Sequence, residues 1–93
     1  AVDIVVLHFG DKYIQELMSH ITRWRAKGVR VFTYPTTHKL KKQMQFANHS
    51  NALWALFYGE EEQKEKTISL KNMIDGTTKK ISIHKINASF FIT

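Results

Sequence analysis

The sequence of 93 residues contains no cysteine, a single proline and no long apolar run. The lack of cysteine excludes disulfide bridges, thiolate metal sites and a cysteine nucleophile. The apolar segment Ala52–Tyr58 has seven residues, whereas a membrane-spanning helix needs about 20, and the sequence shows no secretory signal. We therefore expect one domain over residues 1–93 that functions in the cytoplasm.

Acidic residues are also scarce. The sequence has eight Asp and Glu residues and 14 Lys and Arg residues, which gives a formal net charge of +6. Such an excess favours a polyanionic partner, and RNA, DNA and anionic lipid all meet this description. A soluble domain that happens to be basic is an equally good interpretation of the charge alone.

In the first two-thirds of the chain, short apolar segments typical of strands alternate with longer segments whose apolar residues recur at helical spacing. This order indicates an α/β domain. The run Ala52–Tyr58 lacks alternation and is typical of a strand covered on both faces of a largely parallel sheet. Right-handed crossovers place one helix on each face when the strand order is 2-1-3. The predicted strands are Val2–Phe9, Val29–Tyr34 and Ala52–Tyr58, and the predicted helices are Asp11–Lys27 and His38–Asn48.

Suitable residues stand at the ends of the predicted helices. Asp11 is expected to cap the first helix, and Gly28 suits the position after its last turn. Thr36 or Thr37 is expected to cap the second helix. The last turn of the first helix holds three cations that favour the helix dipole, a structural role preferred here over RNA contact: Arg23, Arg25 and Lys27.

The pattern then changes. Glu60–Lys66 is predicted to be a polar loop. Beyond it, alternating apolar residues at Ile68–Leu70 and Ile81–Ile83 flank Asp75-Gly76, a strong hairpin signal, so a β-hairpin is expected to extend the sheet. Three lysines would protect its exposed edge: Lys79, Lys80 and Lys85. The segment Ile86–Thr93 is compatible with helix or strand, and its apolar residues are expected to pack on the domain: Phe90, Phe91 and Ile92.

Motifs for cofactor or catalytic chemistry are missing. Neither a dinucleotide-binding fingerprint nor a Walker loop is present. The five histidines show no metal-ligand spacing, and each is interpreted as a surface or capping residue. Glu60, Glu61 and Glu62 are adjacent, so their carboxylates are expected to diverge rather than form a catalytic pair. The domain alone is therefore predicted to be non-catalytic and to hold neither a metal nor a cofactor.

One stripe of the second helix combines cations, an amide and an aromatic ring. Lys39, Lys42, Gln43 and Phe46 recur at i, i+3, i+4 and i+7 and would share a face. Stacking on the ring and phosphate contact by the lysines would suit single-stranded RNA. Alternatively, the stripe is a solvated face and Phe46 covers a neighbouring element.

Two segments resemble a known family. The first is Leu40-Lys-Lys-Gln-Met-Gln-Phe-Ala47, followed by the apolar third strand. The second is Gly59-Glu-Glu-Glu62, followed by Thr67-Ile-Ser-Leu-Lys-Asn-Met73 and Asp75-Gly76. Together they resemble the C-terminal anticodon-binding domain of class IIa aminoacyl-tRNA synthetases, most of all that of the histidyl enzymes, over about Val2 to Ile86.

The resemblance implies a three-layer α/β/α fold with a mixed five-stranded sheet of order 2-1-3-4-5, in which strand 4 is antiparallel. It also implies a third, C-terminal helix. Two features depart from the family pattern. Thr77-Thr78 stand where the family usually has a Gln in the hairpin turn, and Asn87–Thr93 matches the final amphipathic helix poorly.

The resemblance also implies where RNA is read. In the related threonyl enzyme, the glutamate of the Gly-x-x-Glu turn and a cation on the next strand contact anticodon bases, and these motif positions are Glu62 and Lys71 here. Alternatively, the two side chains pair with each other, a contact worth about 0–1 kcal/mol when exposed. Four weaker candidates for tRNA contact come from the second helix and its flanking turns, the first two expected to face the same edge: Lys39, Gln43, Thr37 and Asn51.

The implied function is recognition of the anticodon loop of histidine tRNA by one domain of a larger histidine–tRNA ligase. The resemblance implies that the parent is a homodimer and uses ATP and Mg²⁺ in its catalytic part, and no membrane partner is expected. Two other interpretations stay open. One is a synthetase-like regulatory or protein-interaction module, and the other is the equivalent domain of a threonyl-, prolyl- or glycyl-tRNA synthetase, against which the Lys71-Asn72 pattern argues mildly.

Overall fold

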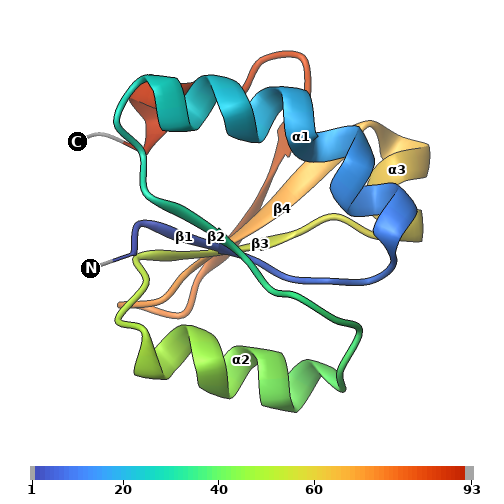
Figure 1. The fold of residues 1–93 in the computed structure, drawn as a ribbon. Coiled ribbons are helices and arrows are strands. Elements are labelled where there is room, and N and C mark those ends of the chain that lie inside the picture. The colour runs from blue at the N-terminus through green and yellow to red at the C-terminus, as the bar shows by residue number, and fades with distance from the viewer. Residues whose placement is uncertain (1, 92–93) are drawn as a thin grey trace.

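The computed structural model describes residues 2–91 and shows a mixed sheet between layers of helices (Figure 1). Its elements are β1 (Ile4–Val6), α1 (Asp11–Ala26), β2 (Val31–Thr33), α2 (Leu40–His49), β3 (Trp54–Phe57), α3 (Glu60–Glu65), β4 (Thr67–Asn72), β5 (Thr78–Ser82) and the 3-10 turn η1 (Ala88–Phe90). The strand order is β2-β1-β3-β4-β5, with β1 parallel to both neighbours and β4 antiparallel to both of its own. The predicted class, strand order and antiparallel fourth strand are confirmed.

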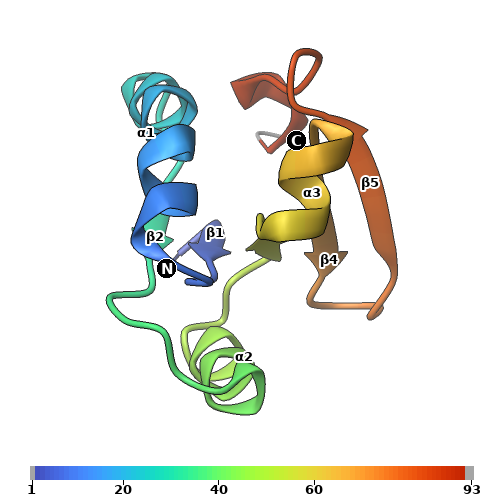
Figure 2. The ribbon, with the colours of Figure 1, turned by 90° about the vertical axis from the view of Figure 1, so that its right-hand side faces the viewer.

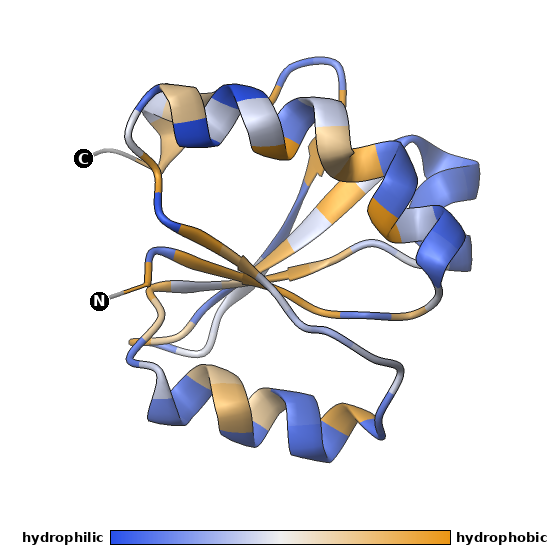
Figure 3. Ribbon diagram, viewed as in Figure 1, coloured by the Kyte–Doolittle hydropathy of each residue, from blue (hydrophilic) through white to orange (hydrophobic). Residues whose placement is uncertain are grey.

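Different helices cover the two faces of the sheet. Ile4 and Val6 belong to the larger core, under α1, whereas Val5 and Leu7 belong to the smaller core against α2, because successive side chains of a strand alternate between faces. Figure 2 shows α1 and the C-terminal segment on one side of the sheet and α2 on the other. In Figure 3 the apolar residues are concentrated in the strands, while α3 is hydrophilic along its length.

The segment predicted as a polar loop is instead the short helix α3. Three glutamates occupy its first turn, where carboxylates favour the positive end of the helix dipole. Glu62 accepts a hydrogen bond from the Gly59 N–H at 2.9 Å, as in a capping box. Lys66, with a φ of 57°, ends the helix in the left-handed region. No residue of α3 is buried, so hydrophobic spacing could not reveal this helix.

Helix α2 begins at Leu40 rather than at His38. Its N-cap residue is Lys39, and no side chain caps it. The predicted cap, Thr36 or Thr37, is therefore wrong. The Thr37 hydroxyl instead lies 2.8 Å from Nδ1 of His8, so it contacts the end of β1 rather than the first turn of α2.

The ends of α1 match the prediction only in part. Asp11 is the first helical residue rather than the N-cap, and its carboxylate pairs with His8. Gly28 follows the last turn with a φ of 95°, which confirms its predicted position. Within residues 2–91, no helix combines the length and the apolar character needed to cross a bilayer.

Among the described residues, the C-terminal segment forms the single 3-10 turn η1, and the amphipathic helix that the resemblance implies is not present there. Phe91 lies edge-on to Trp24 with ring centroids 5.0 Å apart, and Phe90 lies 5.4 Å from Trp54. The prediction that Phe90 and Phe91 pack on the domain is confirmed. Ile92 lies outside the described residues.

Cationic side chains lie at both edge strands of the sheet, one reaching β2 from α1 and two belonging to β5 itself. At β2, Arg25 donates from Nη2 to the Val31 carbonyl at 2.8 Å. At β5, Lys80 pairs with Glu65 at 2.8 Å and Lys79 lies over the Phe90 ring. Cations on an open edge oppose pairing with the sheet of another molecule, which is the role predicted for the lysines of β5.

Candidate nucleic-acid interface

Three turns meet at the carboxyl edge of the parallel strands. They follow β1, β2 and β3 and lead into α1, α2 and α3, whose first turns lie on the right of Figure 1. Open α/β sheets usually bind their ligands at this edge. The predicted site residues are therefore expected to lie at this edge.

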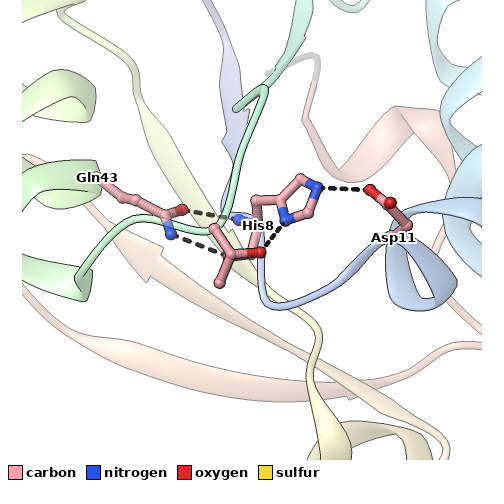
Figure 4. A network of polar contacts seen from close by, with 4 residues as sticks. His8, Asp11 and Gln43 are labelled. Atoms are coloured by element: carbon pink, nitrogen blue, oxygen red, sulfur yellow. Dashed lines mark hydrogen bonds and ion pairs between the residues drawn. The ribbon is translucent and has the colours of Figure 1, made fainter.

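His8 joins two of these turns (Figure 4). Its Nδ1 lies 2.8 Å from the Thr37 hydroxyl, and its Nε2 lies 3.1 Å from a carboxylate oxygen of Asp11. His8 is 7% exposed. The interpretation of every histidine as a surface or capping residue is therefore wrong for His8, because the two turns close over its ring.

The amide of Gln43 fastens α2 to the end of β1. Its Oε1 accepts a hydrogen bond from the His8 N–H at 2.7 Å, and its Nε2 donates to the carbonyls of His8 and His38, each at 2.9 Å. The side chain is fully buried. The expectation that Gln43 shares an exposed stripe with Lys39 is therefore wrong: the amide holds the loop before α2 in place and faces the interior.

Phe46, from the same predicted stripe, also turns toward the domain. Its ring centroid lies 4.9 Å from that of Phe32 and 5.5 Å from that of Tyr34. This geometry favours the alternative interpretation, in which Phe46 covers a neighbouring element. Only the lysines of the stripe remain as exposed side chains.

The carboxylate of Glu62 is held at both oxygens. Oε1 accepts from the Gly59 N–H at 2.9 Å, and Oε2 accepts from the Ser69 hydroxyl at 3.2 Å. A carboxylate offers about four lone-pair sites, so each oxygen can accept a further hydrogen bond. The group is thus fixed in position and still able to bind two donors of a ligand.

Lys71 lies on the same face of β4 as Ser69. Ile68 and Leu70 belong to the core under α1, so alternation directs Ser69 and Lys71 to the opposite face. Two residues along a strand are about 7 Å apart, which places Lys71 one pleat from the hydroxyl that holds Glu62. Among the described residues, no ion pair joins Glu62 to Lys71. The two main predicted residues are brought to one face, and their contact with RNA stays a prediction.

An open pocket of about 390 Å³ adjoins Glu62 and the start of α3. Phe9 and Phe57 form part of its lining, with ring centroids 6.2 Å apart and an interplanar angle of 23°. Aromatic rings beside hydrogen-bonding groups are the usual surface on which unstacked RNA bases lie. The pocket therefore combines aromatic surface with the acceptor oxygens of the carboxylate beside it.

The remaining residues predicted to contact tRNA lie at the two ends of α2. Lys39 and Thr37 are both exposed at the carboxyl edge, where α2 begins. Asn51 follows the last turn of α2 at the other edge of the sheet, with a φ of 55°. The structure does not bring Asn51 together with Glu62, and its left-handed backbone marks it as the residue that ends the helix.

Neighbouring groups shift the pKa values of two side chains near α3. The hydrogen bond to Glu65 raises the pKa of Lys80, and the charges of Glu61 and Glu62 add to this effect. Burial raises the pKa of Tyr58 to about 12, and its hydrogen bond to Glu16 adds to the shift. Tyr58 therefore stays protonated at neutral pH and donates to Glu16 at 2.7 Å, which ties α1 to the turn before α3.

Sequence reasoning misses two residues of this site, His8 and Ser69. Ser69 has a usable signal, because a hydroxyl on the covered part of a strand needs a partner and a glutamate-rich turn precedes it. His8 has none, since its partner Thr37 is 29 positions away. Within residues 2–91, no cluster of three or more His, Asp or Glu side chains could hold a metal ion.

Solved structures share this architecture. The histidyl-tRNA synthetase of S. aureus superposes with a TM-score of 0.85 at 22% sequence identity, over 99% of this chain and 23% of that one. The RNA binding domain of threonyl-tRNA synthetase from Cryptosporidium parvum gives a TM-score of 0.77 at 15% identity, over 90% of this chain and 21% of that one. The fold is therefore that of the class II synthetase anticodon-binding domains.

Sequence comparison leads to the same class. The sequence profile described as "Anticodon binding domain" matches residues 2–90, and the chain belongs to this family. The histidine–tRNA ligase of Thermoanaerobacter sp. (strain X514) is 35% identical over 85 residues, and that of Phocaeicola vulgatus is 36% identical over 74 residues. These alignments cover 91% and 80% of this chain but only 20% and 16% of the two ligases.

Proposed function

We propose that this chain is the anticodon-recognition domain of a histidine–tRNA ligase and that it binds histidine tRNA. Its similarity to histidine–tRNA ligases supports the assignment. The observation that carries it is the Glu62 carboxylate, which Gly59 and Ser69 hold in place while two acceptor positions stay open. A group that is already ordered loses little entropy when the ligand binds.

Guanine is the base that suits this site best. Its N1–H and its exocyclic amine are adjacent donors, which match the two open acceptor positions of Glu62, and the anticodon of histidine tRNA contains guanine. The Lys71 ammonium would donate to a base carbonyl or to a phosphate. The bases of an anticodon loop are free to leave the stack, so a protein can reach these edges, as it cannot in a duplex.

The parent protein would be several times longer than this chain, which spans 20% of the Thermoanaerobacter ligase. Activation of histidine with ATP and Mg²⁺, and its transfer to tRNA, would take place in the remaining part. The 93 residues would contribute affinity and anticodon selection. As the family implies, the parent would be a cytoplasmic homodimer.

Anticodon selection is tested with two RNA stem-loops at one salt concentration. One carries the histidine anticodon, and in the other adenine replaces the anticodon guanines. We expect the chain to bind the first more tightly by about 1–3 kcal/mol, the usual discrimination of a bidentate base contact. Fluorescence anisotropy measures both affinities, and equal values would contradict the proposed function.

Lys39 is expected to act differently, as a phosphate contact. Lys39→Ala should weaken binding of both stem-loops alike and reduce the slope of log affinity against log salt by about 1. Lys41→Ala is the matched control, because Lys41 is also exposed but lies two residues along α2 and therefore on another face. A change in the preference between the two stem-loops would show that Lys39 reads a base instead.

A further inference from the structure

A basic hollow lies at the edge of the sheet opposite to Glu62, between the last turns of α1 and the segment around η1. It consists of two cavities of about 450 and 130 Å³. Lys27, Asn87 and Ala88 line both cavities, so the two adjoin. In Figure 1 this end of α1 and the C-terminal segment lie on the left, away from α3. The hollow is therefore separate from the Glu62 face.

The cations of the basic hollow have no acidic partner in the described part of the chain. Arg23 and Lys27 are four residues apart on α1 and share a face, and neither forms an ion pair within residues 2–91. The sequence has no Asp or Glu from Leu17 to Gly59, nor after Asp75. Within residues 2–91, the hollow thus presents two cations without a carboxylate partner.

Two histidines add to this electrostatic environment. Burial lowers the pKa of His20, and the charges of Arg23 and His84 lower it further. His84 belongs to the loop between β5 and η1. The ionisable groups near the hollow, on α1 and on this loop, are therefore lysine, arginine and histidine side chains. An anion bound here would favour the protonated imidazole and raise the pKa of His20.

The helix dipole does not account for all of this charge. The negative end of a helix amounts to about half an elementary charge, whereas Arg23 and Lys27 carry two whole charges. Arg25, the third cation of the last turn, is already engaged by the Val31 carbonyl. Arg23 Nη2 lies 2.7 Å from Nδ1 of His20, which leaves the other N–H donors of its guanidinium for a ligand. Lys27 forms no ion pair within residues 2–91, so its ammonium can also bind a ligand.

The walls of the basic hollow are apolar beneath these cations. Trp24 and Ile86 are buried and line the smaller cavity together with Ala88. Asn87 accepts from the Ser89 N–H at 3.0 Å through its side-chain oxygen, and within residues 2–91 its NH₂ group has no acceptor, so it can donate to a ligand. A cavity of a few hundred Å³ with a charged rim and apolar walls fits a ligand that joins an anion to a compact organic body.

We propose that the basic hollow binds a nucleotide unit of single-stranded RNA. The phosphate would lie between Arg23 and Lys27, and the sugar and base would lie against Ala88 and Ile86. A free nucleoside monophosphate has the same chemistry. The inference goes beyond the proposed anticodon contact and does not require Glu62.

The test is an NMR titration of the 93-residue chain with uridine monophosphate, hexauridylate, uridine and inorganic phosphate. We expect saturable shifts of the Lys27, Ala88 and Ser89 amides with the monophosphate, about tenfold weaker binding of phosphate alone and no saturation with uridine. Tighter binding of hexauridylate would identify an RNA strand as the ligand, and equal binding would identify the free nucleotide. The His20 imidazole should titrate at a higher pH in the complex.

Variants separate this site from general attraction to a basic protein. Lys27→Gln and Arg23→Gln should each lower the affinity for uridine monophosphate about tenfold, the lower end of what a hydrogen bond to a charged group contributes. Ala88→Leu should block binding by filling the hollow. Lys41→Gln removes the same charge from an exposed position of α2 and should have little effect. Equal losses in Lys27→Gln and Lys41→Gln, or shifts confined to β4 and α3, would overturn the proposal. Uridine lacks the guanine donors, so the result does not depend on anticodon selection.

Discussion

Replacement of Glu62 by glutamine is expected to remove the preference for the guanine-containing stem-loop, a loss of about 1–3 kcal/mol or roughly five- to 150-fold in affinity. Glutamine keeps one side-chain oxygen, which can still accept from the Gly59 N–H, and capping boxes use Glu or Gln alike. The second oxygen becomes an NH₂ group, which would face the donors of guanine. The variant should therefore keep α3 intact and lose only recognition.

Glu61→Gln is the matched control for this experiment. Glu61 is exposed and lines the same pocket, but within residues 2–91 its carboxylate accepts no hydrogen bond, so its substitution removes the same charge without an ordered acceptor. We expect Glu61→Gln to retain the preference between the two stem-loops, with both affinities unchanged or slightly higher. Thermal unfolding of Glu62→Gln should resemble that of the unchanged chain. Preserved discrimination in Glu62→Gln would remove Glu62 from the recognition site.

Gln43→Leu is expected to destabilise the domain by about 3 kcal/mol or more. The substitution leaves the buried His8 N–H without a partner, and two carbonyl groups lose their donor as well. Each unsatisfied buried group costs about 1–3 kcal/mol. For a domain of this size, such a loss lowers the melting temperature by about 12–24 °C. Thermal unfolding followed by circular dichroism measures the effect.

Gln45→Leu provides the control, because Gln45 lies on the same helix but is exposed. A surface substitution of this kind usually changes stability by no more than about 0.5 kcal/mol. Equal melting temperatures for the two variants would show that the Gln43 amide does not stabilise the carboxyl edge. A large loss in Gln43→Leu alone would confirm its buried role.

The sheet was predictable because its signals are local. The unbroken run Ala52–Tyr58 indicates a covered strand, and Asp75-Gly76 marks the hairpin, while the resemblance to the synthetase domains supplies the order of all five strands. The strands are shorter than the apolar runs that predict them. β1 covers only Ile4–Val6, although the apolar residues Leu7 and Phe9 follow it. At His8 the backbone N–H donates to the Gln43 side chain of α2 rather than to a neighbouring strand.

The interior of the carboxyl edge was not predictable. Spacing groups Gln43 with the exposed lysines, yet Gln43 also lies four residues before the buried Ala47 and so shares its inward face. Which stripe faces inward depends on the backbone groups at the end of β1, and these are distant in sequence. α3 escapes prediction for another reason, because the Glu62 side chain and the helix dipole stabilise it without burial of any of its residues.

The contact between Arg25 and the Val31 carbonyl affects how copies of the domain behave when they are crowded, as on a polysome. β2 is only three residues long, and a guanidinium already occupies an acceptor on its open side. A second molecule that docked there would have to displace this bond and place its own backbone beside a cation. Association of two copies through β2 into fibrils is thereby disfavoured.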